Sequence, residues 1–180
     1  MQCIKDTIKN INIVIGCSIG CSYCYARMNN NRFHTIDDFN KPVFFENKLK
    51  MLDNKRHTAY LLTGQSDLSG WNEEWKDKVF SKMKENKNTQ YIFLTKRPEN
   101  IKLKETPDNG WFGVTVTSSK EKTRIDYLRN NIKAKHYHIT FEPMFDDVGK
   151  LDLSNISWIV IGTETGNRKG KISSKREWVF

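Results

Sequence analysis

Residues 91–96 read YIFLTK, and residues 111–116 read WFGVTV. Both runs consist mainly of β-branched and aromatic residues, and each turns polar at its carboxyl end. Short continuous apolar runs of this kind are typical of strands buried on both faces of a parallel sheet. Four further runs have the same character: residues 11–16 (INIVIG), 59–64 (AYLLTG), 136–141 (HYHITF) and 158–162 (WIVIG).

Helical patterns separate several of these runs. Residues 72–85 carry an apolar stripe at helical spacing, preceded by Asn72 as a candidate N-cap. Residues 37–52 and 119–131 are also predicted to be helical. Loops are predicted at residues 29–31, 99–110 and 143–157.

Strands that alternate with helices predict an α/β fold built from β/α repeats. Six repeats are fewer than the eight of a closed barrel, so we expect a partial, open barrel of about six parallel strands. A length of 180 residues suits one domain, and we expect residues 1–180 to form it. A helical pattern that starts at Ser173 still runs at Phe180, which leaves open a truncated carboxyl terminus or a short last helix.

The composition narrows the class of partner. The formal net charge is +9, which fits an anionic partner such as nucleic acid or, equally, the Lys-, Asn- and Ile-rich composition that an AT-rich genome produces. No apolar stretch approaches the roughly 20 residues that span a bilayer. Residues 1–10 lack the apolar middle of a secretory signal. We therefore expect a cytoplasmic protein with no membrane partner.

Three of the four cysteines are closely spaced. Cys17, Cys21 and Cys24 form a CxxxCxxC motif directly after the first predicted strand. Bunched cysteines in a cytosolic chain indicate metal ligands rather than disulfides. Three thiolates can hold three corners of a 4Fe–4S cluster and leave the fourth iron open. The alternative is zinc with Cys3 or a histidine as fourth ligand, while Cys3 is otherwise a bystander or a fourth cluster ligand.

Glycine and aromatic residues accompany the cysteines. Gly16 and Gly20 allow the loop to bend tightly, and Tyr23 is placed to cover the edge of a cluster. Polar residues follow all six predicted strands, and a parallel β/α barrel carries its chemistry at the carboxyl ends of its strands. Glu142 and Glu164, at the ends of the fifth and sixth strands, are predicted to line a pocket, because a buried unpaired carboxylate is costly. We expect His136, His138 and the five tryptophans to serve packing, with base stacking as an alternative for the tryptophans.

The cysteine motif and six further segments resemble the radical S-adenosylmethionine (SAM) superfamily, and within it the phage- and mobile-element-associated proteins that include the mobile pair A family. The segments are residues 16–27 (GCSIGCSYCYAR), 32–39 (RFHTIDDF), 60–69 (YLLTGQSDLS), 91–101 (YIFLTKRPENI), 111–118 (WFGVTVTS), 138–153 (HITFEPMFDDVGKLDL) and 158–166 (WIVIGTETG).

The resemblance implies an enzyme that uses a 4Fe–4S cluster on the three cysteines to cleave SAM and form a 5′-deoxyadenosyl radical, which abstracts hydrogen from a substrate. It implies an external electron donor, such as a flavodoxin or a ferredoxin-like protein, and a second radical SAM protein as partner. The substrate is open, with nucleic acid as one candidate. The competing hypotheses are an iron–sulfur electron-transfer or sensor protein without SAM chemistry, and a zinc-containing nucleic-acid-binding module.

The resemblance also implies roles for residues at the strand ends. The SAM amino group would meet the segment Thr63, Gly64, Gln65, Ser66 and Asp67, which replaces the family's Gly-Gly-Glu-like segment, so Gln65, Asp67 and backbone carbonyls are all candidates. Thr115 and Thr117 would meet the ribose or the carboxylate, and Lys96 or Arg97 would pair with the carboxylate. Lys96, Glu142 and Glu164 are the candidate catalytic residues.

Overall fold

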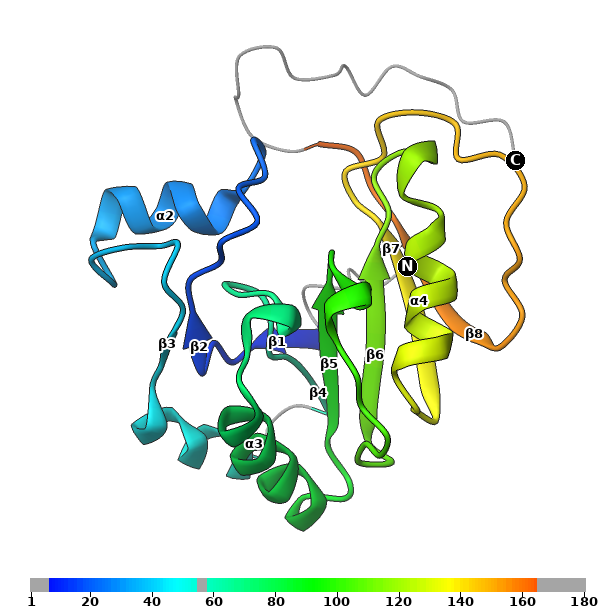
Figure 1. Cartoon of the computed structure of the whole chain (residues 1–180). Coiled ribbons are helices and arrows are strands. Elements are labelled where there is room, and N and C mark those ends of the chain that lie inside the picture. The colour runs from blue at the N-terminus through cyan, green and yellow to red at the C-terminus, as the bar shows by residue number, and fades with distance from the viewer. Residues whose placement is uncertain (1–6, 55–57, 165–180) are drawn as a thin grey trace.

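The computed structural model describes residues 7–54 and 58–164 of the chain. Its centre is a sheet of six parallel strands that curls into a half-barrel, in the order β1-β4-β5-β6-β7-β8 (Figure 1). The partial barrel predicted from the alternating pattern is therefore confirmed. The strands are β1 (Ile8–Asn10), β4 (Ala59–Leu61), β5 (Gln90–Thr95), β6 (Gly110–Thr115), β7 (His136–Phe141) and β8 (Ile156–Ile161).

Two α-helices flank the sheet in the predicted places. Helix α3 (Glu73–Glu85) begins where expected, because the Asn72 side chain accepts a hydrogen bond from the Trp75 backbone N–H at 2.9 Å. Helix α4 (Thr123–Asn131) packs against β6 and β7. Short 3₁₀ turns precede or follow strands: η1 (Glu46–Asp53), η2 (Leu68–Gly70), η3 (Pro98–Asn100) and η4 (Ser119–Glu121). The predicted loops 99–110 and 143–157 contain no α-helix.

The core lies between the sheet and α3. The rings of Phe93 on β5 and Phe112 on β6 stack with centroids 4.9 Å apart, and Phe80 of α3 meets both edge-on. All three side chains are buried. Aromatic burial of this kind contributes most of the packing free energy that holds a helix on a sheet, so the apolar stripe of α3 fixes the middle of the half-barrel.

The first predicted strand is in the wrong place. The sheet begins with β1 at residues 8–10, and within residues 11–16 only β2 (Val14–Ile15) is a strand, paired antiparallel with β3 (Val43–Phe44) in a separate small sheet. Residues 11–16 are apolar because they run through buried space between the two sheets rather than because they form a central strand. At the end of this run, Gly16 forms an isolated parallel bridge with Ser66.

One helix prediction and one loop prediction are also wrong. Residues 37–52 form β3 and part of η1 instead of an α-helix, since Val43 and Phe44 pair with β2. Residues 29–31, predicted as a loop, lie inside helix α2 (Tyr25–Phe33). The buried amide of Asn30 explains this, because it donates to Ile36 O at 2.9 Å and accepts from Ile36 N at 3.0 Å. The pattern from Ser173 lies outside the described residues.

In the part of the chain that the structure describes, no helix combines the length and apolar character that crossing a bilayer demands.

Candidate functional site

The cysteine loop joins β2 to α2 and is anchored at the carboxyl edge of the half-barrel. The Gly16 N–H donates to Gln65 O at 2.9 Å, and the Cys17 N–H donates to Phe39 O at 2.6 Å. Gly16 has a φ of +113°, and a Cβ there would lie 2.9 Å from the Pro42 Cα. Only glycine fits this close approach, so the expected tight bend before the first cysteine is present. The other expected glycine, Gly20, also has a positive φ, +78°.

The three thiols are free and half-buried. The pKa of the Cys17 thiol rises to about 11, mainly because the thiol is buried. A hydrogen bond from the Ile19 backbone lowers this pKa, whereas the negative charges of Asp67, Cys21 and Cys24 raise it. The three cysteines are thus close enough to influence one another's ionisation. Cys24 also caps α2, because its Sγ accepts from the Arg27 backbone N–H at 3.4 Å, and a helix N-terminus favours negative charge.

The sulfurs do not already form a compact single-ion site. Among residues 7–54 and 58–164, no group of three or more His, Cys, Asp or Glu side chains is arranged to hold a metal ion. Cys3 lies outside the described residues.

Tyr23 connects the cysteine loop to the ends of the strands. The Lys96 Nζ, just beyond β5, lies 5.6 Å from the centre of the Tyr23 ring, and the Phe145 ring meets it edge-on at 5.4 Å. The Tyr23 hydroxyl interacts with Thr117 and Cys21, and burial raises its pKa above the usual value. Tyr23 therefore contacts residues that follow three strands: Lys96 after β5, Thr117 after β6 and Phe145 after β7.

Lys96 and Arg97 follow β5 at this edge and have no acidic partner among the described residues. Lys96 and Arg97 are both half-buried. No carboxylate within the described ranges lies at salt-bridge distance from either side chain. A half-buried cation that is not neutralised by the protein favours an anionic ligand. The carboxylate-binding position at Lys96 or Arg97 stays a prediction.

The segment after β4 is occupied by internal hydrogen bonds. The Thr63 hydroxyl accepts from Leu94 N at 2.7 Å, and the Gly64 carbonyl accepts from the Tyr25 hydroxyl at 2.5 Å. Asp67 is buried, and its carboxylate accepts from Ser69 N, Ser69 Oγ, Thr95 Oγ1 and Lys96 N at 2.7–3.0 Å. These residues hold β4, β5 and the cysteine loop together, which the sequence did not predict.

The other predicted residues lie nearby with different exposure. Thr115 is buried, and Thr117 donates its hydroxyl hydrogen to Glu121 at 2.8 Å. Glu164 is buried, whereas Glu142 is exposed and packs over Gly162, where a Cβ would lie 3.0 Å from the Glu142 Cγ. The burial assumed for Glu142 is therefore wrong, because β8 is an edge strand that leaves its neighbour's end open to solvent. The pocket roles of Glu142 and Glu164 stay predictions.

Three residues of the site escaped the sequence analysis. Arg27 donates to Cys17 O at 2.8 Å and to Asn40 Oδ1 at 3.0 Å, with its guanidinium over the Phe39 ring. Tyr25 binds the Gly64 carbonyl, and Phe145 packs on Tyr23. The signal for the first two was available, since Tyr25 and Arg27 follow the last cysteine directly. Phe145 follows a loop whose path only the fold determines.

The arrangement places three thiols, an aromatic ring and two unpaired cations at one edge of a curled parallel sheet. Fold and site together define an α/β protein of partial-barrel type with its polar groups gathered at the carboxyl ends of the strands. The chain belongs to the family described as "Protein of unknown function (DUF5131)", whose model matches residues 2–180. Neither the comparison with curated proteins nor the comparison with solved structures found a match.

Proposed function

We propose that this protein is a radical SAM enzyme, in which Cys17, Cys21 and Cys24 hold a 4Fe–4S cluster that binds SAM at its fourth iron. The observation that carries the proposal is the contact of Tyr23, inside the cysteine motif, with Lys96, Thr117 and Phe145. A cluster on this loop would therefore face the polar carboxyl edge of the half-barrel, where a second ligand would meet strand-end groups.

The donor set fits such a cluster. Thiolates are the standard ligands of iron–sulfur clusters. In a cubane each thiolate binds a different iron, so the sulfurs need not converge on one point as the ligands of a single ion do. The loop also supplies compensation for the negative charge of three thiolates, through the N-terminus of α2 and the Arg27 guanidinium at the Cys17 carbonyl.

A reduced cluster held by Cys17, Cys21 and Cys24 would supply the electron for cleavage of SAM to methionine and a 5′-deoxyadenosyl radical, which would abstract hydrogen from the substrate. An external flavodoxin- or ferredoxin-like donor would provide that electron. Lys96 and Arg97 offset the SAM carboxylate, because both are half-buried and neither has an acidic partner in the described part of the chain. Tyr23 and Phe145 form an apolar cover that keeps water from the reacting atoms. The exposed Glu142 stands at the open side, where a large substrate would enter.

The test is anaerobic reconstitution with iron and sulfide, followed by incubation with dithionite and SAM and an assay for 5′-deoxyadenosine. We expect the wild type to produce it and the Cys21→Ala variant to lose both the cluster absorbance and the product. Cys3→Ala is the matched control, since it also removes one thiol and should keep both. A cluster that leaves SAM intact would favour electron transfer or sensing, and a protein that binds only zinc would refute the proposal.

A further inference from the structure

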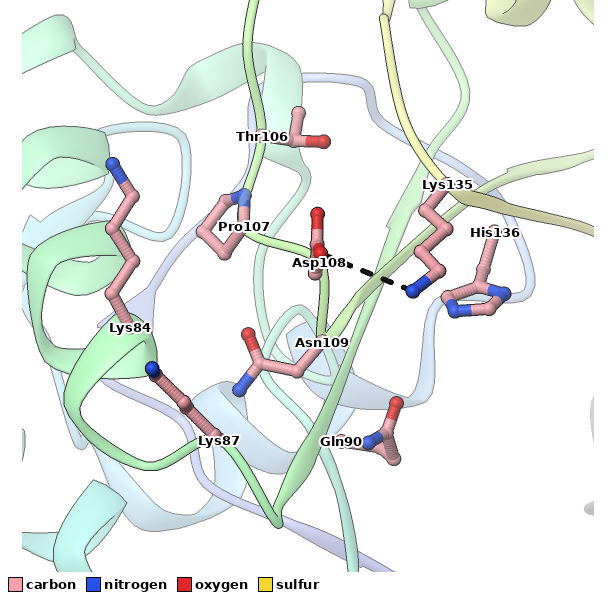
Figure 2. Close-up of a pocket in the computed structure, with 9 residues that line it drawn as sticks. All are labelled: Lys84, Lys87, Gln90, Thr106, Pro107, Asp108, Asn109, Lys135 and His136. Carbon is pink, nitrogen blue, oxygen red and sulfur yellow. Dashed lines mark ion pairs between the residues drawn. The ribbon is translucent and has the colours of Figure 1, made fainter.

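A basic depression lies at the opposite edge of the sheet from the cysteines. It has a volume of about 520 Å³ and is lined by residues that include Lys84, Lys87, Gln90, Asn109, Lys135 and His136 (Figure 2). Gln90 and His136 are the first residues of β5 and β7, and Asn109 immediately precedes β6. The basic depression is therefore formed at the amino ends of the strands, away from the proposed catalytic edge.

The basic depression is positively charged, and few acidic side chains neutralise its lysines. Lys84, Lys87 and Lys135 are exposed. In the described ranges, Lys84 and Lys87 have no ion pair, and Lys135 has only a long contact of 3.9 Å with the exposed Asp108. Flexible lysines around a hollow can follow a chain of phosphates and release its counterions.

The floor of the basic depression is rigid. The Asn109 amide nitrogen lies 2.9–3.1 Å from the carbonyl oxygens of Met83, Asn86 and Thr89. These contacts fix the loop after α3 against the start of β6. Lys84 and Lys87 lie on either side of Asn86 in the sequence, so their backbone positions are set before any ligand binds, which lowers the ordering cost of binding.

One lining residue, His136, belongs to an aromatic cluster. The His136 ring stacks on Trp111 with centroids 4.4 Å apart and an interplanar angle of 11°, and Trp111 meets Trp158 edge-on. The Trp111 indole N–H donates to Gln90 Oε1 at 2.8 Å, which fixes the plane of the stack. All three rings are half-buried, and His136 itself lines the hollow.

We propose that the basic depression binds single-stranded nucleic acid, with Lys84, Lys87 and Lys135 on the phosphates and a base against the His136–Trp111 stack. Positive charge with aromatic side chains is the combination by which proteins hold single strands, whose bases expose their flat faces. A duplex keeps its bases stacked on one another and would use the lysines alone. This inference does not depend on the proposed radical chemistry, because binding needs neither cluster nor SAM.

The experiment measures the anisotropy of fluorescein-labelled 20-nucleotide strands, as DNA and as RNA of one sequence, with the full chain between about 50 and 200 mM salt. Each phosphate contact contributes about 0.7 to the slope of log affinity against log salt for a single strand. We therefore expect the Lys84→Ala/Lys87→Ala variant to bind more weakly, with a slope shallower by about 1.4. The DNA and RNA arms identify which sugar is preferred.

The matched control is Lys120→Ala/Lys122→Ala, which removes the same charge beside η4 at the carboxyl edge. It should leave affinity and slope unchanged. His136→Ala should weaken binding by at least about fivefold at constant slope, since it removes stacking rather than charge. The inference is overturned if both double variants lose the same slope, or if a duplex of the same sequence binds as well as the single strands. Far-UV circular dichroism checks that every variant is folded.

Discussion

The carboxylate of Asp67 offers the sharpest test of the site. Asp67 is 8% exposed and accepts four hydrogen bonds, from Ser69 N, Ser69 Oγ, Thr95 Oγ1 and Lys96 N. If these bonds are its role, Asp67→Asn should destabilise the fold. If its role is to bind the SAM amino group, the same change should leave stability intact and weaken SAM binding.

The magnitude follows from the contacts. Oδ1 accepts three bonds and Oδ2 accepts one, from Lys96 N. Asparagine can keep its oxygen at the Oδ1 position, but its NH₂ group then faces the Lys96 N–H, and one charge-assisted bond worth about 1.5–3 kcal/mol is lost. The three retained bonds weaken because their acceptor becomes neutral, while the buried charge no longer has to be desolvated. We expect a net loss of about 2–3 kcal/mol in the free energy of unfolding.

The assay is urea unfolding followed by circular dichroism. The control is Asp126→Asn, which removes an exposed ion pair with Arg129 and should cost less than about 1 kcal/mol. A loss of less than about 0.5 kcal/mol in Asp67→Asn, within the range of ordinary surface changes, would refute the structural role. A loss of SAM affinity alone would then restore the role inferred from sequence.

Two further predictions concern the interior. Burial lowers the pKa of His138 to about 4, below its unfolded value near 6.5, so the stability that this residue contributes is complete above about pH 6.5 and is lost as the pH falls towards 4. Urea unfolding should therefore show that stability falls by about 2 kcal/mol more between pH 7 and pH 5 in the wild type than in His138→Leu, and equal falls would contradict this. A Cβ on Gly113 would lie 2.4 Å from the buried His138 ring, so Gly113→Ala should lower the melting temperature by about 2–10 °C. Gly162→Ala is its control, because the exposed Glu142 side chain that it meets can move, and equal shifts in the two variants would show that the contact with His138 does not matter.

The sequence alone predicts those elements whose apolar pattern matches the side chains that the fold buries. Residues 91–96 and 111–116 were read as central strands because both faces of such a strand are covered, and β5 and β6 lie there within one residue. Helix α3 was equally predictable, since its apolar stripe and the Asn72 cap are encoded within one segment. The cysteine spacing identified the loop that carries the candidate site, and its glycines identified the bends.

Only the tertiary structure determines the features that depend on residues far apart in the sequence. Residues 11–16 look like a central strand, yet pairing with Val43 and Phe44 takes Val14 and Ile15 into a second sheet. Asn30 looks like a loop residue until Ile36 folds back onto its amide. From the sequence, Asp67 and Thr63 are candidate ligands of a cofactor. Only the fold shows that their side-chain oxygens accept hydrogen bonds from β5 and the residue after it. Polar side chains follow no periodic pattern that reveals their partners, so the sequence determined which groups stand at each edge, while the folded chain determined which of them bind one another.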